Sequence, residues 1–325
     1  MRRALNGRTI VVTGASSGIG RATSIAFARQ GARVVLAARR ETVLQDVADE
    51  CRRAGGQAMA VPTDVVVPEA IESLARAAED QFGAIDVWVN NAGTGVFGPY
   101  GKAPLALHRR TVEVNLLGAM YGAYAVLPRF LEQGYGTLIN NISIGAWCPT
   151  PYAAAYTASK FGLRGFAASL RQELMDQPAI HVCSVFPAII DTPGFLHGAN
   201  FSGRRLSPGP LLYDPEDVAR VIVELAVNPR DEVAVGWPAR AAQIAYAAAR
   251  RPTEWAMSLF MRTALRQLEP APHFEGALMQ PVPQGTSSSG GWRERRHLPS
   301  AATLTQLGFA VGSLALLLGM AAYRK

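Results

Sequence analysis

A glycine-rich turn between a short strand and a helix constrains the fold of this chain more than any other feature. Residues 9–12 form a β-branched, apolar run, the turn TGASSGIG spans 13–20, and a helix is expected over 21–30. Gly31 ends that helix, and a second buried strand is expected at 34–37. Such a turn lets backbone N–H groups approach a phosphate at the positive end of the helix dipole. The unit therefore predicts a dinucleotide-binding motif.

The alternation of strands and helices continues through most of the chain. Further strands are expected at 58–62, 85–89, 137–142, 181–186 and 232–235. Further helices are expected at 44–54, 68–82, 105–131, 152–175 and 215–227. Segments such as IDVWVN and HVCSVF are apolar nearly throughout, as strands buried on both faces of a sheet are. The pattern predicts an α/β fold of Rossmann type, with a doubly wound parallel sheet and helices on both faces.

The residues that end the second strand bear on the choice of cofactor. In folds of this type an acidic side chain at this place hydrogen-bonds the ribose 2′-hydroxyl of NAD. Here Ala38 is followed by Arg39 and Arg40, so no carboxylate repels a 2′-phosphate and a guanidinium is available to bind it. This favours NADP(H). The alternative, that both arginines are simply solvated at the start of a loop, fits Arg40 better than Arg39.

Ser143, Tyr156 and Lys160 form the candidate reactive group. Tyr156 and Lys160 are four residues apart on an expected helix, so both side chains lie on one face. An ammonium near a phenol favours the phenolate and brings its pKa towards working pH. A tyrosine tuned in this way exchanges a proton with a carbonyl or alcohol oxygen, and Ser143 is placed to hydrogen-bond the same oxygen. Taken alone, the YxxxK spacing is more often a surface pair.

Seven motifs in register resemble the short-chain dehydrogenase/reductase family. They follow the family's order and spacing from residue 8 to about residue 236. The matches are TGxxxGIG at 13–20, DV at 64–65, NNAG at 90–93, Asn115, Ser143, YxxxK at 156–160 and PxxxxT at 187–192. The resemblance implies an NADP(H)-dependent oxidoreductase in which a hydride passes between nicotinamide and substrate. A catalytically silent dinucleotide-binding regulator or scaffold at a membrane is the alternative.

The resemblance also implies the roles of the catalytic residues. Tyr156 would be the general acid/base, and Lys160 would lower its pKa while holding the nicotinamide ribose. Ser143 would orient the substrate oxygen. Asn115 would support a water-mediated proton relay to Lys160, whereas the residues alone favour a buried structural asparagine at this position.

The same resemblance implies a set of cofactor-binding residues. The glycine-turn residues would line the pyrophosphate, 64–65 would flank the adenine, 91–93 would run beside the adenosine ribose, and 190 and 192 would contact the nicotinamide carboxamide. The full set is Gly14, Ser16, Ser17, Gly18, Ile19, Gly20, Arg39, Asp64, Val65, Asn91, Ala92, Gly93, Tyr156, Lys160, Pro187, Ile190 and Thr192. The chain departs from the family at Pro187-Ala188, where Pro-Gly is usual, which predicts a slightly different nicotinamide loop.

The segments expected to line the substrate pocket are mostly apolar. They are TGVFGPY at 94–100, GAWCPTPY at 145–152 and the stretch 194–213, and they contribute Val96, Phe97, Trp147, Tyr152, Phe195 and Leu196. A lipophilic ketone or aldehyde and its alcohol are therefore the expected substrates, although apolar pockets are the norm for small molecules. The family resemblance leaves a homo-oligomer open.

Charge and cysteine usage exclude several other classes of protein. The formal net charge is +7, but residues 1–239 carry 22 Lys and Arg against 21 Asp and Glu, whereas residues 240–325 carry 10 against 4. No nucleic-acid-binding signature accompanies the excess, so we expect a solvated or membrane-facing basic surface and no nucleic-acid partner. The three cysteines are far apart and have neither metal-ligand nor disulfide spacing, so no metal is expected.

The end of the chain carries no charge from Leu298 to Tyr323. Residues 304–323 provide the roughly 20 residues that span a hydrocarbon core. WRERRH precedes them and Arg324-Lys325 follows them. The sequence predicts a single transmembrane helix that anchors the chain with its catalytic domain facing the cytoplasm. A hydrophobic helix folded into the core is the alternative.

The expected organisation has four parts. A Rossmann domain is expected over 1–238, a helical extension over 239–269, a flexible linker over 270–300 and the transmembrane helix over 301–323. The linker is expected because Pro, Gln, Gly and Ser accumulate around TSSSGG. The extension, with helices near 239–250 and 253–268, is expected to pack on the domain. The alternatives are that it covers the substrate cleft, rests on a membrane surface or mediates a dimer contact.

Overall fold

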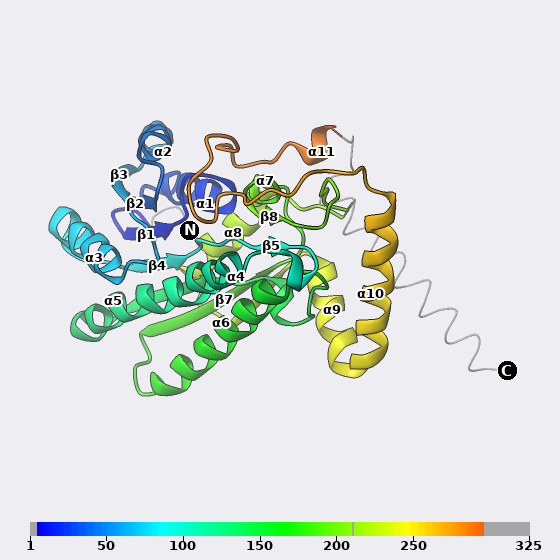
Figure 1. Cartoon of the computed structure of the whole chain (residues 1–325). Helices are drawn as coiled ribbons and strands as arrows, with labels where there is room; N and C mark the ends of the chain where they lie inside the picture. Colours follow the sequence, from blue (N-terminus) through cyan, green and yellow to red (C-terminus); the bar gives the residue numbers. More distant parts are fainter. Residues whose placement is uncertain (1–4, 210, 296–325) are drawn as a thin grey trace.

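The computed structural model describes residues 5–209 and 211–295, and its core is one parallel sheet (Figure 1). Seven strands lie in the order β3-β2-β1-β4-β6-β7-β9. They are β1 (Thr9–Thr13), β2 (Arg33–Ala38), β3 (Gln57–Pro62), β4 (Val87–Asn90), β6 (Gly136–Asn141), β7 (Ile180–Pro187) and β9 (Glu232–Val235). The order reverses between β1 and β4, and at such a point the carboxyl ends of the strands leave a crevice that binds ligands. The predicted Rossmann architecture is confirmed.

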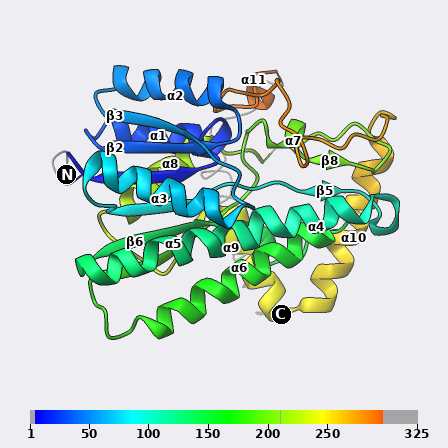
Figure 2. The ribbon, with the colours of Figure 1, turned by 60° about the vertical axis from the view of Figure 1, so that its left-hand side comes forward.

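Helices cover both faces of the sheet (Figure 2). Those of the Rossmann part are α1 (Gly18–Ala28), α2 (Glu41–Arg53), α3 (Pro68–Phe82), α4 (Leu105–Val112), α5 (Gly118–Gln133), α6 (Ala154–Glu173), the short α7 (Gly194–His197) and α8 (Pro215–Leu225). Strands β5 (Val96–Phe97) and β8 (Ala199–Asn200) pair with each other at the substrate side. The connections therefore follow the strand–helix alternation of the sequence.

The alternation of side chains along each strand explains the two layers of helices. Ile10 and Val12 of β1 belong to one buried cluster, and Val11 belongs to another. The first cluster is completed by α1, α2 and α8 through residues such as Phe27, Leu44 and Ile222. The second is completed by α3 and α5 through residues such as Ile71, Leu74 and Phe130. Because both faces are covered, the five inner strands are almost completely buried, whereas the edge strands β3 and β9 are partly exposed.

The long helix expected over 105–131 is interrupted. After α4, residues Glu113–Leu117 form a π-helical turn, and α5 begins at Gly118. Asn115 lies in this turn and is almost fully buried. π-helical turns inside α-helices are frequent at functional sites, because the extra residue redirects a side chain.

The C-terminal extension forms a helical hairpin beside the sheet domain. It consists of α9 (Trp237–Ala248) and α10 (Arg250–Gln267), and a last short helix is α11 (Trp292–Arg295). Among the described residues no helix is both long and apolar enough to cross a bilayer. The transmembrane helix expected over 301–323 lies outside the described residues.

Candidate active site

The glycine turn and the NNAG segment lock together at the carboxyl end of β1. The Asn91 amide nitrogen donates to the Thr13 carbonyl at 2.9 Å, and the Ala92 N–H donates to the Thr13 hydroxyl at 3.1 Å. A Cβ atom at Gly20 would lie 2.2 Å from the carbonyl oxygen of Gly14, so only glycine permits this turn. The predicted residues Gly14, Gly20, Asn91 and Ala92 are thereby brought together.

The remaining glycine-turn residues begin α1. Gly18 has a left-handed φ of 57°, and Ser17 is the N-cap residue with no capping hydrogen bond from its side chain. A Cβ at Gly18 would lie 3.4 Å from the Cβ of Thr192, so the nicotinamide-side loop closes onto the turn. These features fit a dinucleotide, because a glycine turn at a helix N-terminus lets phosphate oxygens approach unshielded N–H groups.

Arg39 and Arg40 both lie against the groove. The Arg40 guanidinium donates to the Ser16 hydroxyl at 3.2 Å. Burial lowers the pKa of both arginines, and the neighbouring cation Arg39 adds to the effect on Arg40. The expectation that Arg40 is simply solvated is therefore wrong: it faces the same space as Arg39, which the sequence had favoured alone.

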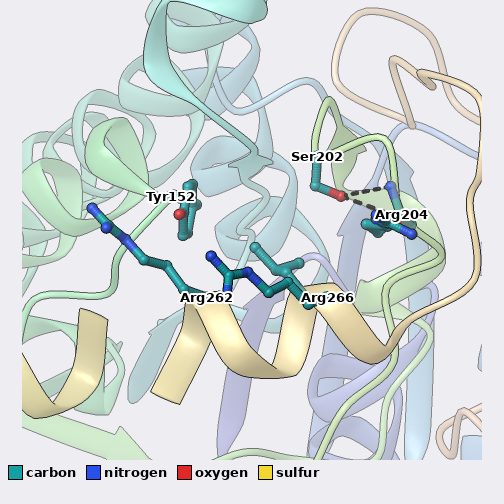
Figure 3. A pocket seen from close by; sticks show the side chains of 6 residues that line it. Tyr152, Ser202, Arg204, Arg262 and Arg266 are labelled. Carbon is teal, nitrogen blue, oxygen red and sulfur yellow. Dashed lines mark hydrogen bonds between the residues drawn. The ribbon is translucent and has the colours of Figure 1, made fainter. Parts of the chain in front are cut away.

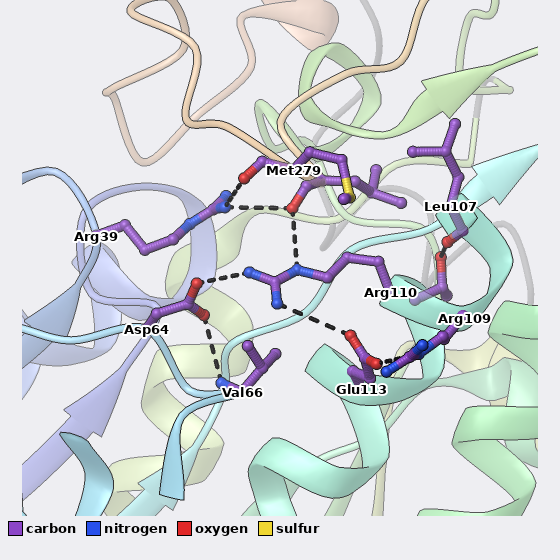
Figure 4. A network of polar contacts seen from close by, with 10 residues as sticks. Arg39, Asp64, Val66, Leu107, Arg109, Arg110, Glu113 and Met279 are labelled. Atoms are coloured by element: carbon purple, nitrogen blue, oxygen red, sulfur yellow. Dashed lines mark hydrogen bonds and ion pairs between the residues drawn. The ribbon is translucent and has the colours of Figure 1, made fainter. Parts of the chain in front are cut away.

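Asp64 and Arg110 form an ion pair next to Arg39 (Figure 4). The Arg110 guanidinium donates to the Asp64 carboxylate at 2.5 Å, and the other carboxylate oxygen accepts from the Val66 N–H at 3.3 Å. Val65 is buried, and its side chain packs so closely on Gly118 that a Cβ at Gly118 would lie 2.8 Å from it. The predicted adenine-flanking pair thus lies at the adenosine end of the groove, while its role stays a prediction.

A C-terminal segment crosses this end of the groove. Residues 277–292, called the strap below, run from the α10 side towards α11 (orange in Figure 1). Its carbonyl oxygens accept from the Arg39 guanidinium and from the Gly18 N–H, the latter at 3.0 Å. The side chain of Leu278 is buried in a small cluster with Val96 and its neighbours. The structure differs here from the expected flexible linker, because backbone carbonyls find donors and an apolar side chain finds a pocket.

Ser143 and Tyr156 lie side by side at the catalytic end. The Ser143 hydroxyl accepts from the Gly145 N–H at 3.0 Å, and it lies close enough to the phenol to act on the pKa of Tyr156. Two glycines flank the phenol: a Cβ at Gly145 would lie 3.2 Å from its ring, and one at Gly95 would lie 3.3 Å from it. The ring therefore sits in a narrow slot beside the serine.

Lys160 is buried beneath Tyr156. Its ammonium donates to the Asn141 carbonyl at 3.0 Å and lies 5.8 Å from the Tyr156 ring centroid. Burial lowers the pKa of Lys160 to about 8. Burial also raises the pKa of Tyr156, and the hydrogen bond with Ser143 opposes this rise. The sequence led us to expect a lowered Tyr156 pKa; in the structure the desolvation of the phenol outweighs its polar neighbours.

Asn115 is fixed by the π-helical turn against the NNAG segment. Its amide oxygen accepts from the Thr94 N–H, and its amide nitrogen donates to the Thr94 carbonyl, both at 2.8 Å. A Cβ at Gly93 would lie 3.6 Å from the Asn115 oxygen and 3.8 Å from the Lys160 ammonium. Asn115 thus has a structural role, because its side chain holds the backbone at Thr94, as the residues alone favour. It also lies near Lys160, where the resemblance places it. The proton relay through Asn115 stays a prediction.

The segment after β7 carries a residue that the sequence interpretation missed. Pro187 ends β7, and Ile190 is buried and forms a β-bridge to Tyr213. Between Ile190 and Thr192 stands Asp191, 1% exposed, whose carboxylate accepts from the Trp292 N–H at 3.1 Å. A charged residue between two predicted cofactor-binding positions was the only signal in the sequence. Its partner comes from the strap, which no local pattern indicated.

The substrate side is only partly as expected. Phe97 and Tyr152 form a ring pair with centroids 6.0 Å apart, next to the helix that bears Tyr156. Trp147, which was expected to line the pocket, is instead buried and stacks on Phe186 at 4.0 Å. That assignment was wrong, because a large ring beside β7 is better accommodated in the core.

A cavity of about 370 Å³ opens between the Tyr152 loop and α10 (Figure 3). Its lining is mostly polar, and no acidic side chain belongs to it: Tyr152, Ser202, Arg204, Arg262, Leu265 and Arg266. Tyr152 has a left-handed φ of 66°, the only such non-glycine residue among the described ones. Unusual backbone conformations of this kind cluster at functional sites. Within the described residues no group of His, Cys, Asp and Glu could hold a metal ion.

Comparison with known proteins agrees with this geometry. A family model described as short chain dehydrogenase matches residues 8–197. The chain belongs to the short-chain dehydrogenase/reductase family. An uncharacterized oxidoreductase of Bacillus subtilis (strain 168), YxnA, is 32% identical over 305 residues, which cover 92% of this chain and 86% of that protein.

Two solved structures of the family are also similar. A metagenomic short-chain oxidoreductase in complex with NADP is 34% identical with a TM-score of 0.61, covering 71% of this chain and 97% of that one. The 3-ketoacyl-(acyl-carrier-protein) reductase from Brucella melitensis complexed with NADH is 28% identical with a TM-score of 0.65, covering 71% and 98%. The short-chain dehydrogenase/reductase described here is accordingly an NAD(P)-dependent enzyme that acts on CH–OH donors, with a nicotinamide dinucleotide as its cofactor.

Proposed function

We propose that this enzyme interconverts a lipophilic ketone or aldehyde and its alcohol, with NADP(H) as cofactor and Tyr156 as general acid/base. The observation that carries the proposal is the arrangement of Ser143, Tyr156 and Lys160 at one end of the dinucleotide groove. A Cβ at Gly145 would lie 3.2 Å from the Tyr156 ring and 3.4 Å from the Ser143 hydroxyl, so the two side chains are neighbours, and the buried Lys160 ammonium lies beneath the phenol. A bound nicotinamide dinucleotide supplies or accepts the hydride.

The protonation states favour proton donation by Tyr156. Because burial raises its pKa above the ordinary value of 10.0, the phenol is protonated at neutral pH. In the reductive direction it donates that proton to the substrate oxygen, which Ser143 holds by a hydrogen bond. Lys160, with a pKa of about 8, is mostly protonated at pH 7 and stabilises the phenolate that remains. In the oxidative direction the same groups act in reverse.

NADP(H) preference is supported by the two guanidinium groups at the adenosine end. Arg40 lies beside Ser16, and Asp64, the carboxylate that interacts with Arg39, is already paired with Arg110. A 2′-phosphate carries up to two negative charges, so it gains more from these cations than a 2′-hydroxyl does.

The substrate class is supported by the apolar ring pair of Phe97 and Tyr152 and by relatives of the family. The solved relative from Brucella melitensis is titled a 3-ketoacyl-(acyl-carrier-protein) reductase, and a relative from Eggerthella lenta is a 3beta-hydroxysteroid dehydrogenase. Both named substrate classes have large apolar parts.

The test is a panel of apolar ketones and alcohols assayed with NADPH and NADP. Tyr156→Phe should lower kcat by at least about 10²-fold, because the proton donor is lost. Tyr124→Phe is the matched control, since Tyr124 is 84% exposed on α5 and should leave turnover unchanged. Full turnover in Tyr156→Phe would refute the mechanism.

We further infer that residues 301–323 anchor the enzyme in a membrane with the catalytic domain on the cytoplasmic side. The support is the uncharged run 304–323 between WRERRH and Arg324-Lys325. The full chain should remain in the membrane fraction after a salt wash, whereas a chain that ends at residue 296 should be released. Retention of the shortened chain would contradict the anchor.

A further inference from the structure

The strap offers hydrogen-bond acceptors to the groups that are predicted to bind phosphates. We propose that residues 277–287 occupy the phosphate-binding donors of the groove, and that NADP(H) must displace them in order to bind. The inference rests on the proposed use of NADP(H). According to this proposal, the strap competes with the cofactor for the same hydrogen-bond donors, and the competition is strongest where the 2′-phosphate binds.

The adenosine end supplies the first part of the evidence. The Arg39 guanidinium donates to the carbonyl oxygens of Ala277, Leu278 (3.2 Å) and Met279 (3.3 Å), as Figure 4 shows in part. The Leu278 oxygen also accepts from Arg110 at 3.3 Å. Three converging oxygens around one guanidinium are the arrangement that a phosphate would offer it.

The same pattern continues along the glycine turn. The Arg40 guanidinium donates to the carbonyl oxygens of Val282 at 3.1 Å and Gln284 at 3.2 Å. The Arg21 guanidinium donates to Thr286 at 2.7 Å. The Gly18 N–H, at the start of α1, donates to the Ser287 carbonyl at 3.0 Å. Each of these contacts uses a strap carbonyl as acceptor, and the Arg21 guanidinium is in addition paired with the Glu50 carboxylate.

The two acceptors differ in strength. A backbone carbonyl is neutral, whereas a phosphate is negatively charged, so a phosphate adds the attraction of an ion pair and bidentate geometry to its hydrogen bonds with a guanidinium. A dinucleotide can therefore take the donors from the strap, at a cost in affinity. NAD(H) lacks the 2′-phosphate and has less to gain at Arg39 and Arg40, so the strap also sharpens the choice between the two cofactors.

The strap can leave the donors without leaving the protein. At the nicotinamide end, Asp191 holds the far end of the strap by accepting from the Trp292 and Arg293 N–H groups, both at 3.1 Å. Gly276 and Gly285 pack against the loop of α7, where a Cβ would lie 2.3 Å from the His197 carbonyl and 2.6 Å from the His197 ring, respectively. The contacts of Gly276 and Gly285 do not involve the groups of the groove that donate to the strap carbonyls. Substitutions at these two glycines therefore change the position of the strap and leave the donors themselves intact.

The first experiment compares two fragments of the cofactor on the full chain. Adenosine 2′,5′-bisphosphate carries the 2′-phosphate, and AMP does not. Amide hydrogen exchange in 277–287 should become faster at saturating bisphosphate and should change little with AMP. Slower exchange in these residues with the bisphosphate would show that the strap closes over the ligand instead of yielding to it, and would overturn the proposal.

The second experiment loosens the strap by substitution. Gly276→Ala, directly before the strap, combined with Gly285→Ala, within it, should strain the seating of the strap and lower the Kd of NADPH by about threefold to tenfold, measured by fluorescence titration. The control, Gly55→Ala with Gly134→Ala, places alanine at two left-handed glycines that have open space around them. An unchanged or raised Kd in the strap variant, with faster amide exchange in 277–287, would refute the competition. Failure of turnover in the substrate panel would instead concern the proposed reaction, since neither readout here uses activity.

A second observation, at the substrate side, carries a separate inference. We infer that the cavity of Figure 3 binds an anionic group, phosphate or carboxylate, at one end of an apolar substrate. This rests on the proposed reaction and narrows its substrate class. Arg262 and Arg266 are four residues apart on α10, where like charges repel each other, and neither forms an ion pair within the described part of the chain. Tyr152, in its left-handed conformation, lines the same cavity from the loop before Tyr156.

The test is a binding comparison that does not depend on turnover. Octyl phosphate should bind the full chain at least about tenfold more tightly than 1-octanol, and octanoate should show whether a carboxylate suffices. Arg262→Gln with Arg266→Gln should abolish the difference, while Arg250→Gln with Arg251→Gln, on the same helix, should preserve it. Equal binding of octyl phosphate and 1-octanol, or equal losses in both double variants, would refute the subsite and leave the proposed reaction standing.

Discussion

The two ends of the dinucleotide groove are built in different ways. At the catalytic end, Ser143, Tyr156 and Lys160 come from one short stretch of sequence and are held by β6, α6 and the flanking glycines. At the adenosine end, the Arg39 guanidinium contacts carbonyl oxygens that lie 238–240 residues away in the sequence. The catalytic end is buried and set by the core of the fold, whereas the adenosine end is completed by a segment with few apolar contacts.

The difference indicates that the two ends of the groove serve different needs: a rigid geometry for catalysis at one end, and entry and exit of the cofactor at the other. Groups that move a proton need a fixed geometry, so they belong in the part with the highest packing density. A cofactor has to enter and leave, so the elements over it should come from the less stable part of the structure. We therefore expect substitutions at the catalytic end to change kcat or the free energy of unfolding, and substitutions at the adenosine end to change binding.

The largest effect should come from the catalytic end. Ser143→Ala removes the hydroxyl that is proposed to hold the substrate oxygen beside Tyr156, and loss of one such donor costs about 10²–10³-fold in kcat. Steady-state kinetics with NADPH should show this fall with little change in the KM for NADPH. Ser73→Ala is the control, because Ser73 is an exposed serine whose hydroxyl bonds only within α3. A large rise in the KM for NADPH would contradict the expectation that the catalytic end affects kcat and the adenosine end affects cofactor binding.

An intermediate effect should come from the adenosine end. Arg39→Ala removes a charge-assisted contact of about 1.5–3 kcal/mol, so the KM for NADPH should rise by about 10–100-fold. The KM for NADH should change much less, and so should kcat. Arg53→Ala, at an exposed position of α2, should leave both values unchanged. Equal effects on the two cofactors would contradict the role of Arg39 in 2′-phosphate binding.

The smallest effect concerns stability and pH at the catalytic end. Lys160→Met should raise the free energy of unfolding at pH 7 by about 1–3 kcal/mol, because it removes a buried cation whose pKa is lowered from 10.5 to about 8. Between these two pH values the unfolded chain binds the lysine proton more tightly, so wild-type stability should rise with pH. The gain from Lys160→Met should therefore be complete below pH 8 and disappear above about pH 10.5. Urea denaturation at several pH values measures this, and a destabilised variant at pH 7 would contradict it.

The sequence predicted the fold and the catalytic end because their signals are local. Strand–helix alternation determines the sheet, and the spacing of Tyr156 and Lys160 places both on one face of α6. The interruption at Asn115 was not predictable, since a π-helical turn has no composition of its own and depends on the fit of α4 and α5 to the sheet.

The adenosine end shows where prediction from sequence stops. Arg40 appeared solvated because its acceptors at 282 and 284 belong to a segment rich in Pro, Gly and Ser, which looked like a linker. The strap contacts the groove mainly through backbone carbonyls, and every residue type has one. No pattern of side chains could therefore reveal the contact, and only Asp191, a buried carboxylate, hints at it.

The most direct measurement is the Kd of NADPH in four versions of the full chain: wild type, Arg39→Ala, Gly276→Ala with Gly285→Ala, and all three substitutions together. If the strap and the 2′-phosphate share the Arg39 guanidinium, loosening the strap should tighten NADPH binding in the wild type and should have a much smaller effect once Arg39 is absent. Additive effects, with the same gain from strap release in both backgrounds, would contradict competition for this donor.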